Sequence, residues 1–155
     1  RLQDMMQRAF DKMAAHNAVP LLPSDDGFRM LPSPDYPPAA LREALANAIT
    51  HRDYETANTP VRFYWYHDRI EITSPGGPYG MVTEDNFGTQ NAFDHRNRRL
   101  AAVMKHLGYV EIFGRGIPLI RRALRDNHNP QPEFVVKPIS TGNYVQVVLK
   151  KREMP

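Results

Sequence analysis

The sequence predicts an α+β fold, specifically a two-layer α/β sandwich in which helices cover one face of a mostly antiparallel sheet of about four strands. Residues 61–73 and 134–150 each contain two short stretches in which apolar and polar residues alternate, as in half-buried strands. In four other segments, apolar residues recur every three or four positions, which is typical of amphipathic helices. A chain of 155 residues can bury one core of this kind, so we expect a single domain.

The N-terminal part of the chain is expected to lead into this domain. Residues 1–16 have the periodicity of an amphipathic leading helix. Residues 17–37 are rich in proline, which excludes a long helix and leaves room for a short edge strand, so we expect a structured crossing or a lid. Because the chain opens on Arg1, we also expect it to be a fragment of a longer protein.

The helix predicted at 38–52 combines an apolar face with a line of polar side chains. Its apolar stripe consists of Leu41, Ala44, Leu45, Ala48 and Ile49. Glu43, Asn47 and His51 follow one another at intervals of four residues and therefore share one side of the helix. Asp35 is expected to cap the start of this helix, where Pro37 and Pro38 suit the first turn.

Two hairpins and two further helices complete the predicted domain. Residues 61–73 are expected to form the first hairpin, with a turn at His67 and Asp68, and residues 133–150 form a closing hairpin. Between them, residues 98–107 and 117–126 are expected to be helical. The second of these helices follows Gly114 and Gly116, and main-chain amides at such a start favour anions.

Positive charge is concentrated in one part of the chain. The net charge is +3, but residues 96–125 carry eight basic residues and one acidic residue, so this segment has a charge of +7 and the remainder −4. The imbalance favours a phosphate-bearing partner, either a nucleotide or a nucleic acid. A solvated helix face balanced by acids elsewhere in the fold is an equally good explanation.

Composition excludes several classes of protein. The chain has no cysteine, which excludes disulfides and thiolate metal sites, and its six histidines lack metal-ligand spacing. No apolar stretch approaches the roughly 20 residues that cross a membrane. We expect a cytoplasmic protein without a membrane partner.

Four motifs together resemble a known family. They are Glu-Ala-Leu-Ala-Asn-Ala-Ile-Thr-His-Arg-Asp-Tyr from Glu43, Ser-Pro-Gly-Gly from Ser74, Arg96-Asn97, and Phe-Gly-Arg-Gly-Ile ending at Ile117. In this order they resemble the divergent GHKL (Bergerat-fold) ATP-binding domain of prokaryotic transcriptional regulators, which is often labelled as similar to the C-terminal part of a RecG-type DNA helicase. The resemblance spans roughly residues 38–125, which would form the nucleotide-binding core.

The resemblance implies ATP and Mg²⁺ as cofactors and assigns roles to individual residues. Asn47 would be the Mg²⁺ ligand and Glu43 the general base for an attacking water. His51 would meet the ribose or a phosphate, or cap the helix. Residues 78–113 would form a mobile lid. The other nucleotide-binding positions implied are Ser74, Gly76, Gly77, Gly80, Arg96, Asn97, Gly114, Arg115, Gly116 and Ile117.

One position departs from the family pattern. Members generally carry an aspartate at the end of the strand before the first glycine turn, where it binds the adenine amino group, and this chain has Thr73-Ser74-Pro75 there. A neutral group in place of a buried carboxylate is expected to weaken binding by about 1 to 3 kcal/mol. The Ser74 hydroxyl or a main-chain carbonyl would have to substitute.

Three functions follow from these observations. The first is an ATP-binding regulatory domain, with or without slow ATPase activity, in a regulator that contacts DNA through domains outside this fragment. The second is a nucleic-acid-binding module that uses the basic segment and no nucleotide. The third is a homodimerisation or scaffolding module that has lost nucleotide binding.

Overall fold

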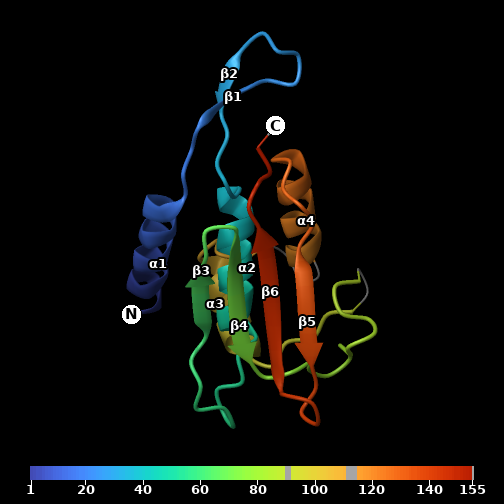
Figure 1. The fold of residues 1–155 in the computed structure, drawn as a ribbon. Helices are drawn as coiled ribbons and strands as arrows, with labels where there is room; N and C mark the ends of the chain where they lie inside the picture. The colour runs from blue at the N-terminus through green and yellow to red at the C-terminus, as the bar shows by residue number, and fades with distance from the viewer. Residues whose placement is uncertain (90–91, 111–114, 155) are drawn as a thin grey trace.

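The computed structural model describes residues 1–89, 92–110 and 115–154 and confirms the predicted fold class. A four-stranded antiparallel sheet has the order β3-β4-β6-β5. Its strands are β3 (Arg62–Trp65), β4 (Arg69–Pro75), β5 (Glu133–Lys137) and β6 (Tyr144–Lys150). One face of the sheet is covered by α2 (Pro38–Thr50), α3 (Arg98–His106) and α4 (Gly116–Asp126), while α1 (Leu2–His16) lies at the side (Figure 1).

Strand register places one set of apolar residues, from all four strands, on the face toward the helices. In the central pair, Ile72 lies opposite Phe63 on one side and Val147 on the other. Because successive side chains of a strand point to opposite faces, Ile70 and Leu149 share that inner face. The alternation predicted from sequence is therefore the pattern that the sheet uses.

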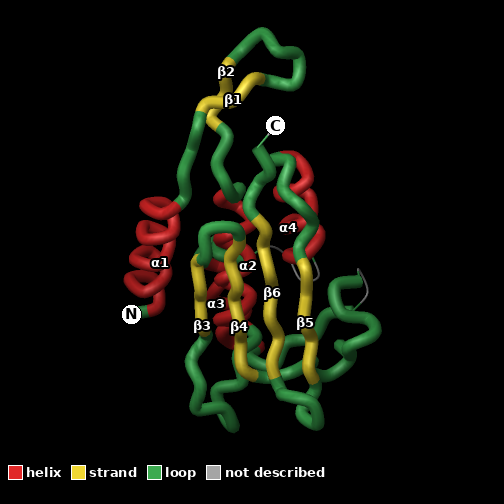
Figure 2. Tube along the Cα trace, viewed as in Figure 1, coloured by secondary structure: helices red, strands yellow, loops and turns green. Residues whose placement is uncertain are grey.

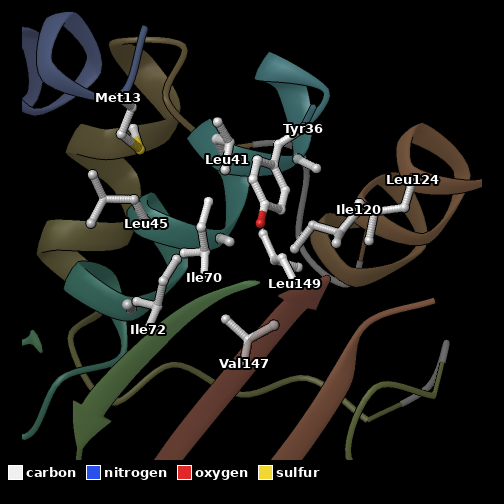
Figure 3. Close-up of a cluster of buried hydrophobic side chains, with 13 residues drawn as sticks. Met13, Tyr36, Leu41, Leu45, Ile70, Ile72, Ile120, Leu124, Val147 and Leu149 are labelled. Atoms are coloured by element: carbon white, nitrogen blue, oxygen red, sulfur yellow. The ribbon is translucent and has the colours of Figure 1, made fainter. Parts of the chain in front are cut away.

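The main core lies between α2 and this inner face. Figure 3 shows Leu41 and Leu45 of α2 above Ile70, Ile72 and the β6 side chains, with Ile120 and Leu124 of α4 closing one side. Small residues let the helix approach the sheet closely, and Ala40 and Ala44 of α2 are buried there. Met6 of α1 and Met104 of α3 form a second cluster around Ala46.

Most of residues 17–37 form an arm that projects from the domain, whereas Tyr36 at its end is buried in the main core. Strands β1 (Leu21–Pro23) and β2 (Met30–Pro32) pair as an antiparallel hairpin that projects from the end of the sheet opposite the C-terminal end of β4 (Figures 1 and 2). Asn17 fixes the base of the arm, because its amide donates to the Tyr36 carbonyl at 2.8 Å and its Oδ1 accepts from the Tyr36 N–H at 3.0 Å. The predicted edge strand is thus one half of a short hairpin.

The expectation that Asp35 caps α2 is wrong. The helix begins at Pro38 with Pro37 at the N-cap position and no side-chain capping bond. Asp35 instead forms an ion pair with Lys151 at 3.1 Å, while its main-chain N–H donates to the Ala18 carbonyl. The N-cap position is taken by Pro37, which has no side-chain oxygen, and Asp35 lies two residues too early to serve. The Ala40 N–H donates instead to the Pro37 carbonyl at 3.0 Å.

The helices of the described residues are all too short or too polar to cross a membrane.

Replacing Leu149 with alanine is expected to lower the free energy of unfolding by about 2 to 5 kcal/mol, because this fully buried side chain fills the space between sheet and helices. Urea unfolding followed by circular dichroism measures the change. Val103→Ala is the control, because Val103 is 47% exposed, and it should shift stability by less than about 0.5 kcal/mol. Equal effects of the two substitutions would contradict the core described above.

Candidate functional site

A mainly apolar cavity of about 180 Å³ lies at the end of the sheet where β4 finishes. Its walls include the second half of α2, the turn after β4, the start of α4, strand β6 and residues from 78–89 and 92–95. Eight of the residues predicted for the nucleotide site line it: Glu43, Asn47, His51, Ser74, Gly76, Gly77, Gly116 and Ile117.

The other predicted residues lie elsewhere. Gly80, Arg96, Asn97 and Arg115 are outside the cavity lining, and Gly114 lies outside the described residues. Arg96 and Asn97 instead lie on a separate depression beside α3.

The polar line of α2 meets the start of α4 inside the cavity. Asn47 Nδ2 donates to Glu43 Oε1 at 3.3 Å, and Glu43 is 2% exposed. A Cβ atom on Gly116 would lie 2.5 Å from Glu43 Oε1 and 2.8 Å from Asn47 Nδ2, so a side chain at this position would displace these two groups. The two side chains predicted to hold Mg²⁺ and to act as the base are therefore adjacent, with a main-chain segment of α4 directly against them.

The last carbonyls of α2, and that of Arg52 just beyond it, accept hydrogen bonds from side chains later in the chain. The last carbonyls of a helix have no partner within the helix. The Ser74 hydroxyl donates to the Ala48 carbonyl at 2.7 Å, and the Tyr54 hydroxyl donates to the Ile49 carbonyl at 2.6 Å. Asn97 donates to the carbonyls of Thr50 at 2.9 Å and Arg52 at 2.6 Å. Ser74 and Asn97 thus hold the end of α2.

The Gly76–Gly77 turn is bonded in the same way to neighbouring loops. Its two N–H groups donate to Asn143, to the main-chain oxygen at 2.8 Å and to Oδ1 at 3.0 Å. Gly76 has φ +103°, and a Cβ atom there would lie 2.8 Å from Asp53 Cβ. The turn places main chain along the cavity wall, but its amides are already used.

Asp53 and Arg96 brace the outside of this turn. Hydrogen bonds from Thr56, first through its hydroxyl and then through its N–H, hold the pKa of the buried Asp53 carboxyl below its ordinary value. Arg96 lies 3.7 Å from Asp53 Oδ2 and donates to the Gly77 carbonyl at 3.2 Å. Arg96 therefore fixes the turn from outside the cavity.

His51 lies at the end of α2 and stacks on His95. The two ring centroids are 5.1 Å apart, with an angle of 19° between the ring planes. Burial, the neighbouring His95 and the positive charge of Arg96 together lower the pKa of His51 to about 4. Burial also lowers the pKa of His95. Both rings are therefore neutral near pH 7.

Residues 78–89 and 92–95 contribute apolar side chains to the cavity wall. Val82, Phe87 and Phe93 line it, and the Phe87 ring packs on Phe134 with centroids 5.4 Å apart. The Met81 N–H donates to Asp94 Oδ2 at 3.2 Å, which joins the two ends of the segment. From the sequence, this region is expected to be a lid, and none of its apolar side chains is assigned a binding role. Its few apolar residues in an otherwise polar loop are the feature that could have indicated which side chains line the cavity.

The lining of the cavity includes acidic side chains. Among the described residues, the cavity is lined by the carboxylates of Glu43 and Asp94 and by no lysine or arginine. In the part of the chain that the structure describes, no three histidine, aspartate or glutamate side chains are grouped to hold a metal ion. A cation bound here would rely on Asn47, Glu43 and its own waters or ligand.

The sheet, its helical cover and the cavity between α2, the glycine turn and α4 define an ATPase-like domain of the HATPase type. The chain belongs to the family described as "Putative ATP-dependent DNA helicase recG C-terminal", which matches residues 58–149. Helix α2 precedes the matched residues. No curated protein matches the chain.

A solved structure has a similar fold. The DIP2311 protein from Corynebacterium diphtheriae superposes with a TM-score of 0.82 at 24% sequence identity, over 96% of this chain. The match spans 29% of that protein's chain, so the present chain corresponds to less than a third of it. At this identity the similarity concerns the fold.

Replacing Asn97 with alanine is expected to lower the free energy of unfolding by about 1 to 3 kcal/mol without any ligand, because two main-chain carbonyls lose their donor. Urea unfolding gives the value, and Asn58→Ala, at an exposed asparagine, is the control. If Asn97 served only a ligand, the free protein would be as stable as the wild type.

Stability is expected to fall as the pH drops from about 6.5 to about 4. In that window the unfolded chain takes up a proton at His51 that the folded protein excludes, whereas above it both states are neutral. The loss should be about 1 to 3 kcal/mol. The measurement is the difference between the unfolding free energies at pH 7.5 and at pH 5, taken separately for the wild type and for each variant.

His51→Gln should reduce this difference, and His106→Gln, at an exposed histidine, should leave it unchanged. An identical pH response in the wild type and His51→Gln would contradict the buried neutral state of His51.

Proposed function

We propose that this domain binds a magnesium nucleotide, ATP in the first instance, as the regulatory part of a larger cytoplasmic DNA-binding transcriptional regulator. One observation carries the proposal: Glu43 and Asn47 meet the side-chain-free start of α4 inside a cavity of an ATPase-like fold. The regulatory and DNA-linked part rests on the family description and on the motif resemblance.

The residues present fit such a ligand. Mg²⁺ prefers oxygen ligands and keeps several waters, so the amide oxygen of Asn47 and phosphate oxygens form an adequate direct set, and Glu43 would accept a hydrogen bond from a bound water. The absence of a side chain at Gly116 leaves main chain next to them. The remaining walls, with Ile72, Ile117 and Phe134, suit a planar base.

Base recognition is expected to differ from that of the wider superfamily. The Ser74 hydroxyl is 4% exposed and its proton is given to the Ala48 carbonyl, so toward a ligand it can only accept. It is a neutral acceptor where relatives carry a carboxylate. We therefore expect weak discrimination between adenine and guanine nucleotides, by about tenfold or less.

Hydrolysis is a separate question from binding. Glu43 would act as the base for a water, which has to reach a carboxylate that is 2% exposed beneath Gly116. We propose binding as the main activity, with hydrolysis slow. Hydrolysis would be established if the wild type released phosphate from ATP and the Glu43→Gln variant did not.

Binding is tested by titrating Mg-ATP, Mg-ADP and Mg-GTP into the protein by calorimetry and by thermal melts. A nucleotide at 100 times its dissociation constant should stabilise the fold by about 2.7 kcal/mol. Asn47→Ala should abolish the effect and Asn58→Ala should preserve it. No heat with any nucleotide, or equal binding by Asn47→Ala, would overturn the proposal.

A further inference from the structure

A second depression lies on the other side of the cavity wall. It is lined by Tyr54, Tyr79, His95, Arg96, Arg98 and Arg99, at the start of α3. Tyr79 and His95 also line the cavity described above, so the two hollows share a wall. The depression differs from the cavity in charge, because its charged side chains are all arginines.

These arginines are only partly neutralised. Arg98 lies 3.9 Å from Asp94 and its side chain is 83% exposed, so this ion pair is weak. Arg99 is exposed and has no ion pair with any described residue. Arg96 is the inner member: it faces Asp53 at 3.7 Å, and its Nε is buried without a hydrogen-bond acceptor among the described residues.

The start of α3 adds main-chain donors to this charge. Asn97 occupies the N-cap position, where an asparagine oxygen ordinarily accepts from the first turn, but it makes no capping bond. Its amide instead donates to the carbonyls of Thr50 and Arg52 at the end of α2. No side chain caps the first turn of α3, which carries the partial positive charge of a helix start, and residues 98–100 of this turn line the depression.

Two tyrosine rings flank the charged groups. Tyr54 is 46% exposed and is held by the bond from its hydroxyl to the Ile49 carbonyl. Tyr79 is 41% exposed, and the Arg96 guanidinium lies 4.8 Å from its ring centroid. Exposed aromatic rings beside arginines can stack on a planar group attached to a phosphate.

We propose that this depression binds a phosphomonoester that carries an aromatic ring. Arg98, Arg99 and the amides of α3 hold the phosphate, whose two negative charges match this donor set better than a single charge would. Tyr54 and Tyr79 offer the ring a stacking surface. The site is distinct from the proposed nucleotide cavity, and binding there does not require Asn47 or Mg²⁺.

The probe is phenyl phosphate, titrated by calorimetry in low salt without Mg²⁺, with inorganic phosphate and phenol as separate arms. Phenyl phosphate should bind more tightly than inorganic phosphate, and phenol should give no saturable heat. The double substitution Arg98→Gln and Arg99→Gln should weaken binding by about tenfold or more, which corresponds to 1.4 kcal/mol or more. Circular dichroism verifies that each variant is folded.

The matched control is Arg122→Gln with Arg125→Gln, which removes the same charge from exposed positions of α4. It should change the affinity by less than about twofold. An equal loss in both double variants would mean that net charge alone attracts the probe, and would overturn the site. No saturable binding to the wild type would overturn it as well.

Asn47→Ala separates this inference from the proposed function. It should bind phenyl phosphate as the wild type does, even though it loses Mg-ATP. Loss of both ligands in Asn47→Ala would place the phosphate in the cavity and overturn the second site. If phenyl phosphate binding is lost only in the variant with both Arg98→Gln and Arg99→Gln, the second site is supported, whether or not the protein binds Mg-ATP.

Discussion

The end of α2 is the point on which the rest of the structure depends. Its last carbonyls are drawn into the protein, where an unpaired acceptor is destabilising by about 1 to 3 kcal/mol. Donors from three parts of the chain bond them: Tyr54 in the loop directly after α2, Ser74 at the end of β4 and Asn97 before α3. Each bond also positions the segment that supplies the donor. The end of one helix therefore fixes the sheet, a loop and another helix at one place beside the cavity.

This arrangement changes the meaning of the motifs. Ser74, Gly76, Gly77, Arg96 and Asn97 all resemble ligand-binding positions, yet their donors or close contacts are used within the protein. The glycine amides bond Asn143, and Asn97 bonds main-chain carbonyls. These residues hold main-chain segments and a few polar side chains around the cavity. The motif residues therefore determine the shape of the cavity, and the polar side chains of α2 are the groups that could act on a ligand.

The fold and half of this site could be predicted from sequence because they follow local periodicity. Alternation gave the strands, and the spacing of Glu43, Asn47 and His51 put them on one side of α2. The role of Asn97 was hidden, because its partners lie 45 and 47 residues earlier in the chain. Nothing local distinguishes a capping asparagine from a ligand-binding one. The sequence of residues 78–95 has no periodicity that would indicate which side chains face the cavity. The positions of Phe87 and His95 in the cavity lining could therefore be found only from the structure.

The division of charge between the two hollows constrains how a nucleotide could enter. A triphosphate in the cavity would face the Glu43 and Asp94 carboxylates without a lining arginine or lysine among the described residues. Two like charges 4 Å apart repel by about 4 kcal/mol at an effective dielectric constant of 20. A divalent cation between Asn47, Glu43 and the phosphates reverses the sign of that interaction. Nucleotide and metal affinities would then be strongly coupled, each raising the other by the same factor. An uncharged nucleoside would enter without the metal, because the apolar walls and the neutral His51 ring impose no such requirement.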